Sequence, residues 1–262
     1  MEERQVALYY REYGGEDSPL MVFIHGGGVS GWMWDKQIAY FTNYHCLVPD
    51  LPGQGRSSSE ELFTIKGSAE EIADLIVKKG NGKPVIAIGF SLGAQVLVAL
   101  LSLHPHLIDY AIINSALVRP FPFPKVFAKS LIIAHPLVKN KAFSNIQAKS
   151  MYIDPAYREL YYEESRELSK STFVQIMIEN MSFTIPEHFK HSSSKILATV
   201  GDKENSMMKK SVRDLVKHSP NCTGIVIPKT GHGVSLQRPD FFNKLVDEWV
   251  TVQRLPEEAI IV

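Results

Sequence analysis

The sequence predicts an α/β fold with a mostly parallel central sheet, helices on both faces and one inserted helical segment. Short apolar runs of strand length alternate with helix-length segments over residues 1–116 and again over 191–262, which is the rhythm of βαβ units. Residues 117–190 are instead rich in aromatic residues and proline and show no strand pattern. We therefore expect a discontinuous core, 1–116 and 191–262, with a helical cap at 117–190.

The individual elements follow from apolar periodicity and turn-forming residues. Expected strands lie at 6–13, 20–24, 45–48, 84–88, 108–113, 196–200 and 224–227. Expected helices lie near 34–41, after Ser68, at 92–103, at about 208–217 and from 239 onward. Ser68 with Glu71 three residues later fits a capping box at the start of a helix. Because several strands are apolar throughout, we expect both faces of the sheet to be covered.

The composition is that of an ordinary globular protein. The chain has 262 residues, 45% of them hydrophobic, and its 28 Lys and Arg balance 28 Asp and Glu. This length can bury a core without disulfides, and the zero net charge gives no field that attracts nucleic acid. No segment is apolar enough for a membrane span or a secretion signal, so we expect a cytoplasmic location. Cys46 and Cys222 are expected as buried thiols, although one bridge between them remains open.

The strongest chemical signal is Gly-Phe-Ser-Leu-Gly at 89–93, where an expected buried strand gives way to a helix. A serine on so sharp a turn is lifted clear of the sheet, and only very small residues fit two places on either side of it. Gly89 and Gly93 meet that need. A serine helix cap beside a tight turn is the plainer interpretation, but the junction of strand and helix favours Ser91 as a nucleophile.

A nucleophilic serine needs a base within hydrogen-bond reach and an acid that orients the base. His232 follows the strand at 224–227 and precedes the last helix, so we expect it at the same edge of the sheet as Ser91. The loop after the strand at 196–200 offers Asp202 and Glu204 as the acid. His188 and His191 have the spacing of a metal-binding pair but lack a third ligand, so no metal is expected.

The order serine, acid, histidine resembles that of the α/β hydrolases, in particular the capped esterases, lipases and carbon–carbon hydrolases. The resemblance covers nearly the whole chain and includes His-Gly-Gly-Gly at 25–28 and Asp-Leu-Pro-Gly-Gln-Gly-Arg-Ser at 50–57. It implies the α/β hydrolase fold with an inserted cap. It also implies that the acid lies three residues after Gly201, at Glu204, with Asp202 as the alternative. Glutamate is the less common residue at this place.

The resemblance further implies an oxyanion hole made by the backbone amides of Leu92 and Gly27, with Gly28 as a neighbour that the sequence does not exclude. His25 is expected to hold this glycine loop in place. The implied activity is that of a serine hydrolase that needs no cofactor and cleaves a small to medium, partly apolar ester through an acyl-serine intermediate. Trp32, Trp34 and Phe90 are expected to flank the site. The cap is rich in aromatic residues, which either line the site or, as is more common at helical spacing, form the core of the cap.

Several alternatives remain open at this point. Carbon–carbon bond, lactone or thioester hydrolysis, acyl transfer and perhydrolysis could use the same three side chains. A ligand-binding protein on a hydrolase fold is the alternative outside catalysis, because a fold does not establish an activity. A dinucleotide fingerprint starting at Gly53 fails, because Ser58 stands where a third glycine is required. The oligomeric state is open between monomer and homodimer.

Overall fold

One mostly parallel sheet forms the centre of the computed structural model, which describes residues 8–57, 63–131, 137 and 139–262. In the described residues the strand order is β1-β3-β2-β4-β5-β6-β7-β8. The strands from β2 to β7 pair in parallel, whereas β1 and β8 pair antiparallel at the two edges. The strands are β1 (Tyr10–Tyr13), β2 (Leu20–Ile24), β3 (His45–Pro49), β4 (Val85–Phe90), β5 (Tyr110–Asn114), β6 (Lys195–Gly201), β7 (Cys222–Ile227) and β8 (Ile260–Ile261).

The predicted fold class is confirmed, with two differences at the edges of the sheet. The first strand begins at Tyr10, and residues 6 and 7 of the predicted range lie outside the described residues. The short β8 was not predicted, because two exposed isoleucines near the end of the chain carry no strand signal of their own. It forms because β7 offers it an unpaired edge, with Ile260 opposite Val226.

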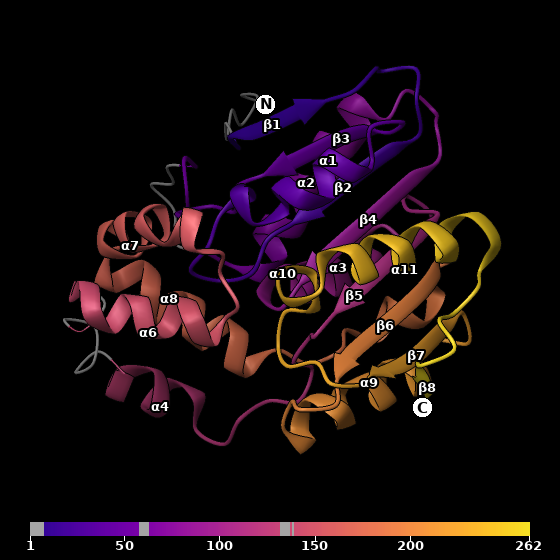
Figure 1. The fold of residues 1–262 in the computed structure, drawn as a ribbon. Helices are drawn as coiled ribbons and strands as arrows, with labels where there is room; N and C mark the ends of the chain where they lie inside the picture. The colour runs from indigo at the N-terminus through magenta and orange to yellow at the C-terminus, as the bar shows by residue number, and fades with distance from the viewer. Residues whose placement is uncertain (1–7, 58–62, 132–136, 138) are drawn as a thin grey trace, which may run out of the picture.

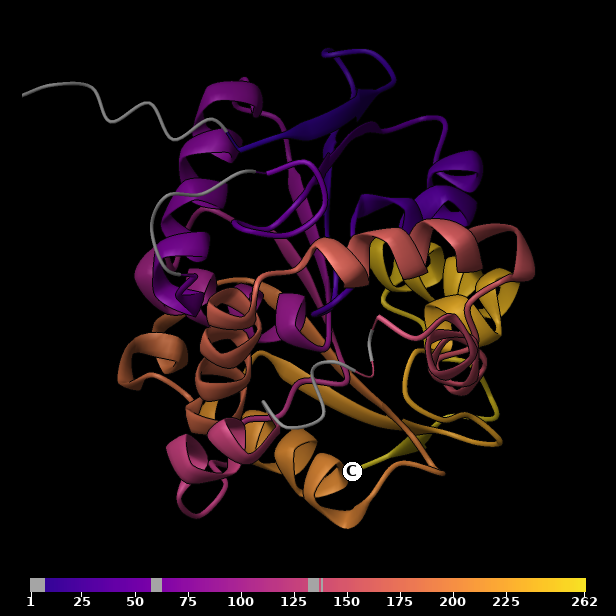
Figure 2. The same cartoon turned by 90° about the vertical axis from the view of Figure 1, so that its left-hand side faces the viewer.

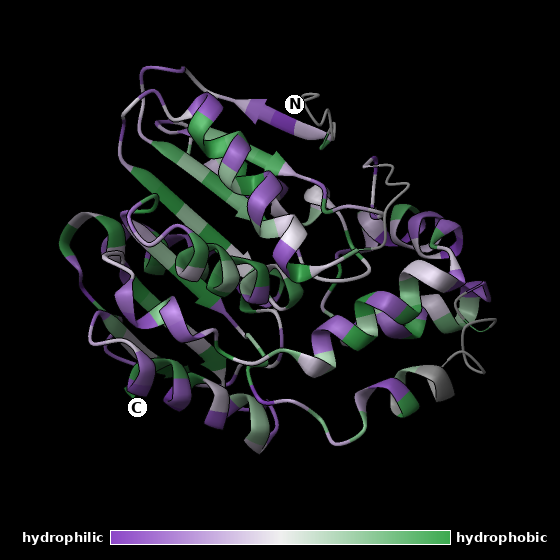
Figure 3. Cartoon of the chain, turned by 180° about the vertical axis from the view of Figure 1, so that it is seen from behind, coloured by the Kyte–Doolittle hydropathy of each residue, from purple (hydrophilic) through white to green (hydrophobic). Residues whose placement is uncertain are grey.

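Helices cover both faces of the sheet (Figures 1 and 3). They are α1 (Asp35–Tyr40), α2 (Ile65–Lys79), α3 (Leu92–Leu103), α9 (Ser206–His218), α10 (Val234–Gln237) and α11 (Pro239–Val252). Alternate residues of β2 point to opposite faces, so Val22 packs in the cluster that contains α2, α3 and α9, and Phe23 packs in the one that contains α11. This two-sided burial explains why the central strands β2 and β4 are hydrophobic along their whole length, as the green strands in Figure 3 show.

The start of α2 differs from the expectation. The helix begins at Ile65, one turn earlier than predicted, and the Thr64 side chain caps it by accepting a hydrogen bond from the Gly67 amide at 2.9 Å. Ser68 lies inside the helix, where its hydroxyl donates to the Thr64 carbonyl at 2.9 Å. The expected capping box at Ser68 is therefore wrong, because Thr64 already satisfies a free amide of the first turn.

Between β5 and β6 the described chain is helical and contains no strand. Its α-helices are α4 (Pro124–Leu131), α6 (Lys141–Ser150), α7 (Arg158–Glu167) and α8 (Lys170–Ser182). These helices gather beside one end of the sheet, and Figure 2 views the chain from the side that they occupy. Within this group α4 packs against α8, and α6 packs against α7.

Two further expectations concern the cysteines and the membrane. Cys46 and Cys222 are both free and buried, so the bridge that the sequence left open is not formed. Burial raises the pKa of each thiol to about 12, as expected for thiols with a structural role. Across the described ranges, no helix has both the length and the apolar character that crossing a bilayer requires.

Candidate active site

The polar residues singled out in the sequence follow the carboxyl ends of neighbouring strands. Ser91 follows β4, Glu204 follows β6 and His232 follows β7, while the glycine loop that starts at Gly26 follows β2. Parallel strands place all of these loops at one edge of the sheet, and the helices between β5 and β6 lie beside the same edge (Figure 1). This edge therefore brings together Ser91 and His232, which are 141 residues apart in the sequence.

Ser91 occupies a strained turn between β4 and α3. Its backbone has φ 53° and ψ −111°, a left-handed conformation that costs a residue other than glycine about 1–3 kcal/mol. The turn is also tight. A Cβ atom at Gly89 would lie 2.5 Å from the Gly93 carbonyl oxygen, and a Cβ atom at Gly93 would overlap the Ile24 carbonyl oxygen. The two glycines thus let the chain bend sharply enough to present the Ser91 hydroxyl.

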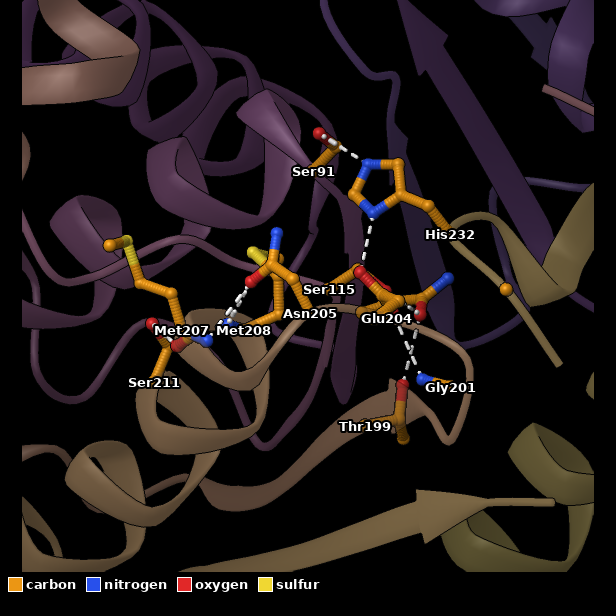
Figure 4. A network of polar contacts seen from close by, with 12 residues as sticks. Ser91, Ser115, Thr199, Gly201, Glu204, Asn205, Met207, Met208, Ser211 and His232 are labelled. Carbon is orange, nitrogen blue, oxygen red and sulfur yellow. Dashed lines mark hydrogen bonds and ion pairs between the residues drawn. The ribbon is translucent and has the colours of Figure 1, made fainter. Parts of the chain in front are cut away.

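A chain of hydrogen bonds links Ser91 to His232 and Glu204 (Figure 4). The His232 ring lies with Nε2 3.0 Å from Ser91 Oγ and with Nδ1 2.7 Å from Glu204 Oε2. The Phe90 ring, 5.0 Å from the imidazole between centroids, packs beside it. With a proton on Nδ1 donated to the carboxylate, Nε2 keeps a lone pair that can accept the serine proton.

Glu204 is held in a fixed orientation by its second carboxylate oxygen. Oε1 accepts a hydrogen bond from the Ser115 hydroxyl at 2.7 Å and another from the Gly201 amide at 3.0 Å (Figure 4). Burial acts to raise the pKa of Glu204, but its hydrogen bonds and the charge of His232 outweigh burial and lower the pKa below the ordinary value. The carboxyl group is thus kept ionised, the form that orients an imidazole. Ser115 was not anticipated from the sequence, where it is an ordinary residue after a strand.

Asp202, the alternative acid, points elsewhere. Its Oδ1 accepts a hydrogen bond from the Thr230 amide at 3.0 Å, and the amides of Lys229 and Thr230 lower its pKa despite the opposing effect of desolvation. In the described residues no hydrogen bond joins Asp202 to His232. The structure therefore brings Glu204, and not Asp202, to the imidazole.

The glycine loop after β2 presents backbone amides near Ser91. The Gly28 amide donates to Gln54 Oε1 at 2.9 Å, so it is already used. Within the described part of the chain, the amides of Gly27 and Leu92 donate no hydrogen bond, and both residues line the same cavity as Ser91. Gly27 and Leu92 are therefore the amides that remain available to a ligand oxygen.

His25 ties this loop to the chain after β3, as expected. Its Nε2 accepts a hydrogen bond from the Leu51 amide at 2.8 Å, so Nδ1 carries the proton and donates to the Gly26 carbonyl at 2.7 Å. The side chain is fully buried, and burial lowers its pKa, which keeps the ring neutral. The neutral imidazole has a hydrogen bond at each of its two nitrogens, and these bonds fix the loop. Neither nitrogen is therefore free to accept or donate a proton in a reaction.

A cavity of about 290 Å³ opens above Ser91. Its floor is made by Gly27, Ser91 and Leu92, and the remainder comes largely from the helices between β5 and β6. The residues that these helices contribute are Gln147, Met151, Tyr161, Ser165, Leu168, Phe173, Ile176, Met177 and Asn180. Tyr161 and Phe173 belong to the aromatic residues of the insertion, but the other members carried no signal in the sequence, because side chains that face a cavity have the same periodicity as core residues.

The expectation for the tryptophans is wrong for Trp34, which has no exposed surface and packs against Phe23 and Phe242 in the core. Its position in the turn after the glycine loop suggested the site, but the ring is directed at the sheet. Trp32 stacks on Tyr157 and donates from Nε1 to Glu164 at 2.8 Å, away from the cavity above Ser91.

No cluster of metal ligands occurs among the residues that the structure describes. His188 and His191 lie close together, with ring centroids 5.8 Å apart, but no third ligand joins them.

Comparison with known proteins identifies the family of this chain. The sequence profile of the α/β hydrolase family matches residues 21–245 of the chain. The chain belongs to the α/β hydrolase family. The crystal structure of the enol-lactonase from Burkholderia xenovorans superposes with a TM-score of 0.78 over 93% of this chain and 96% of the enzyme at 18% identity. At that identity the likeness concerns the fold.

Curated relatives of this chain differ in their sequence identity and in how much of each protein the match covers. The putative carbamate hydrolase RutD of Caulobacter is 24% identical over 91% of this α/β hydrolase and 94% of its own length. An AB hydrolase superfamily protein of Gibberella zeae is 32% identical over 38% of this chain, and the match spans only 36% of that relative. The lipase LipV of Mycobacterium tuberculosis is 29% identical and is likewise matched over 38% of its length. These relatives are named as a hydrolase superfamily protein, a lipase and a putative carbamate hydrolase.

Proposed function

We propose that the protein is a serine hydrolase that cleaves a small to medium, partly apolar ester through an acyl-serine intermediate. The observation that carries this proposal is the hydrogen-bonded chain from Ser91 through His232 to Glu204, with distances of 3.0 and 2.7 Å. A serine hydroxyl is a weak nucleophile alone, and these two partners are what activates it. Relatives named esterase, lipase and carbamate hydrolase support hydrolysis at a carbonyl carbon.

In the acylation step, Ser91 Oγ forms a bond to the ester carbonyl carbon while its proton passes to His232 Nε2. The carbonyl oxygen becomes an oxyanion, and Glu204 stabilises the imidazolium without taking its proton. When the tetrahedral intermediate collapses, the bond from carbon to the leaving oxygen breaks and Nε2 donates its proton to the departing alcohol. A water molecule then attacks the acyl carbon, His232 takes a proton from it, and the acid leaves as Ser91 regains its hydrogen.

The oxyanion would be bound by the amides of Leu92 and Gly27. Donors fixed in advance stabilise the transition state, and the loss of one typically costs about 2.7–4 kcal/mol. The Leu92 amide lies at the beginning of α3, where the first amides of a helix have no partner within the helix. Gly28 is the weaker candidate, because Gln54 already accepts its hydrogen bond.

The helices of 117–190 act as a cap in this proposal. They supply the apolar upper part of the cavity, with Phe173, Ile176 and Met177 from α8 and Tyr161 from α7. An apolar wall of this kind favours an ester with a hydrocarbon acyl part and excludes water from the reacting carbonyl. No cofactor is part of this mechanism.

Labelling with a fluorophosphonate, combined with turnover of p-nitrophenyl esters of increasing chain length, tests the proposal. The native protein should be labelled at Ser91 and should hydrolyse esters of short to medium chain. The S91A variant should lose both properties. Unchanged hydrolysis by S91A, or labelling at another residue, would remove the mechanism.

A further inference from the structure

The cavity above Ser91 has a few uncharged polar groups among its apolar walls. In the described part of the chain no charged side chain lines it, so a charged acyl group would find no counter-ion there. Two side-chain amides belong to the lining, Gln147 of α6 and Asn180 of α8. In a mostly apolar cavity a small number of polar groups sets the specificity. These amides are therefore the groups that can select among uncharged substrates.

A buried glutamine fixes the orientation of the Asn180 side chain. Gln95 lies on α3, and its side chain has no exposed surface. The backbone carbonyl oxygens of Leu117 and Asn180 lie 2.6 and 2.9 Å from the same terminal atom of Gln95. A carbonyl oxygen only accepts hydrogen bonds, so this atom is the nitrogen Nε2, and Oε1 is the other end of the Gln95 amide.

The same reasoning passes from Gln95 to Asn180. Gln95 Oε1 is an acceptor, so the side-chain atom of Asn180 that lies 2.9 Å from it must be the nitrogen Nδ2. Turning over either amide would place two acceptors against each other inside the protein. The two backbone carbonyls that hold Gln95 therefore also determine that Asn180 directs Oδ1 away from Gln95.

Asn180 Oδ1 remains free to bind a ligand. It accepts no hydrogen bond from any residue that the structure describes, and it is not one of the buried polar atoms that lack both a partner and accessible surface. Asn180 is half-buried and lines the cavity above Ser91, whereas Gln95 does not line it. The amide thus meets this cavity with its oxygen end, which has two lone-pair positions for a donor.

The position of this acceptor relative to the reacting carbonyl follows from α3. The Gln95 backbone amide donates to the Ser91 carbonyl at 3.1 Å, so Gln95 lies one helical turn, about 5.4 Å along the axis, beyond Ser91. The Asn180 side chain contacts Gln95 directly. Its oxygen is therefore near the place where the first carbons of an acyl chain on Ser91 would lie.

We propose that Asn180 Oδ1 accepts a hydrogen bond from a hydroxyl group on the second or third carbon of the acyl chain, so that the substrates are esters of hydroxy acids. A hydroxyl group can donate to Oδ1, whereas an ether oxygen or a hydrocarbon chain cannot. A protonated amine could also donate, but it would bring a charge into a cavity without a carboxylate. This inference rests on the proposed function, because it assumes an acyl group on Ser91.

Gln147 does not make the same selection. Its side-chain amide forms no hydrogen bond with any described residue, so it can rotate to present either its oxygen or its nitrogen to the cavity. A ligand group that donates and one that only accepts are then bound equally well by Gln147. The preference for a donor comes from Asn180, whose orientation is fixed.

The test compares kcat/KM for pairs of methyl hexanoates that carry either a hydroxyl or a methoxyl group on the same carbon, the second or the third, as single enantiomers. The two groups withdraw electrons to a similar extent, so the esters of a pair differ in the donor and in size. At one of the two carbons the hydroxy ester should exceed the methoxy ester about tenfold, the net value of one hydrogen bond. The ratio is the measured quantity, because general damage to the site lowers both rates together.

Three alanine variants show which side chain binds the hydroxyl group. In N180A the ratio should fall by about the same factor of ten, because the acceptor is removed. Q147A removes the other amide of the cavity and should keep the ratio. N145A makes the same chemical change as N180A at an exposed residue of α6 that does not line the cavity, and it should also keep the ratio.

Three results would overturn the inference. A native ratio near one at both carbons excludes a selected hydroxyl group without reference to any variant. A ratio that N180A leaves intact comes from the size of the methoxyl group, and a ratio that Q147A abolishes assigns the hydroxyl group to Gln147. Each of these results leaves the proposed function in place, since the esters are still hydrolysed. Absence of turnover and of fluorophosphonate labelling refutes the proposed function and this inference with it.

Discussion

Replacing Glu204 by glutamine should nearly abolish turnover, for a reason that the hydrogen bonds determine. The Gly201 amide and the Ser115 hydroxyl both donate to Oε1, at 3.0 and 2.7 Å. In the E204Q variant the amide oxygen must occupy this place, which turns the new NH₂ group toward His232 Nδ1. Two donors cannot face each other, so the imidazole must move its proton to Nε2 and lose the lone pair that accepts the Ser91 proton.

The size of the effect follows from this change of tautomer. A serine hydrolase with a wrongly protonated imidazole loses up to about 10⁴-fold in kcat, or about 5 kcal/mol of transition-state stabilisation. The assay is kcat for a p-nitrophenyl ester at neutral pH, with circular dichroism to show that the variant is folded. D202N is the control, because the Asp202 carboxylate accepts from the Thr230 amide and does not bond to the imidazole. Its kcat should stay within about threefold of the native value. If E204Q keeps more than a tenth of the activity, or if D202N loses it instead, the orienting role of Glu204 is refuted.

Three further predictions concern stability. S91G and S91A should both be inactive. In urea unfolding S91G should be more stable than S91A by about 1 kcal/mol, because glycine adopts the positive φ of residue 91 without strain. If S91A is the more stable variant, the backbone at residue 91 is not strained. G93A should be destabilised by about 3 kcal/mol or more, since its Cβ overlaps the carbonyl oxygens of Ile24 and His25; a native melting temperature would show that the turn can relax. Burial raises the pKa of Glu164, so the folded state binds the proton more tightly and native stability falls as pH rises through the carboxyl range up to that pKa. The E164Q variant lacks this titration. The melting temperature of E164Q minus that of the native protein should therefore increase as pH rises over the same range. A difference that does not change with pH would refute the raised pKa of Glu164.

Much of the candidate site could be predicted from the sequence because its signals are local. Gly89 and Gly93 stand only four positions apart around Ser91, and a Cβ atom at Gly89 would meet the backbone of Gly93 within the same turn. His232 and the acidic loop could be placed because parallel strands bring their carboxyl ends to one edge. The geometry agrees with these expectations, and the catalytic roles remain proposals.

Other features could not be predicted, because they depend on contacts across the fold. The choice between Glu204 and Asp202 is made by donors from Ser115 and Thr230, which lie 89 and 28 residues away from their acceptors. The use of the Gly28 amide by Gln54 is equally non-local. Trp34 was predicted to flank the site because it follows the glycine loop in the sequence. Its ring is instead buried in the core, which only the tertiary structure shows.

The sequence by itself determined the α/β class, the order of the strands along the chain and the strained serine turn, because hydrophobic period and glycine spacing act over a few residues. Only the tertiary structure decided which acid meets His232, which amides stay free and which side chains of 117–190 face the cavity above Ser91. Those outcomes depend on donors and acceptors that are distant in the sequence. A hydrogen bond forms only where the donor and acceptor atoms have the right distance and angle, and residue type alone does not determine these positions.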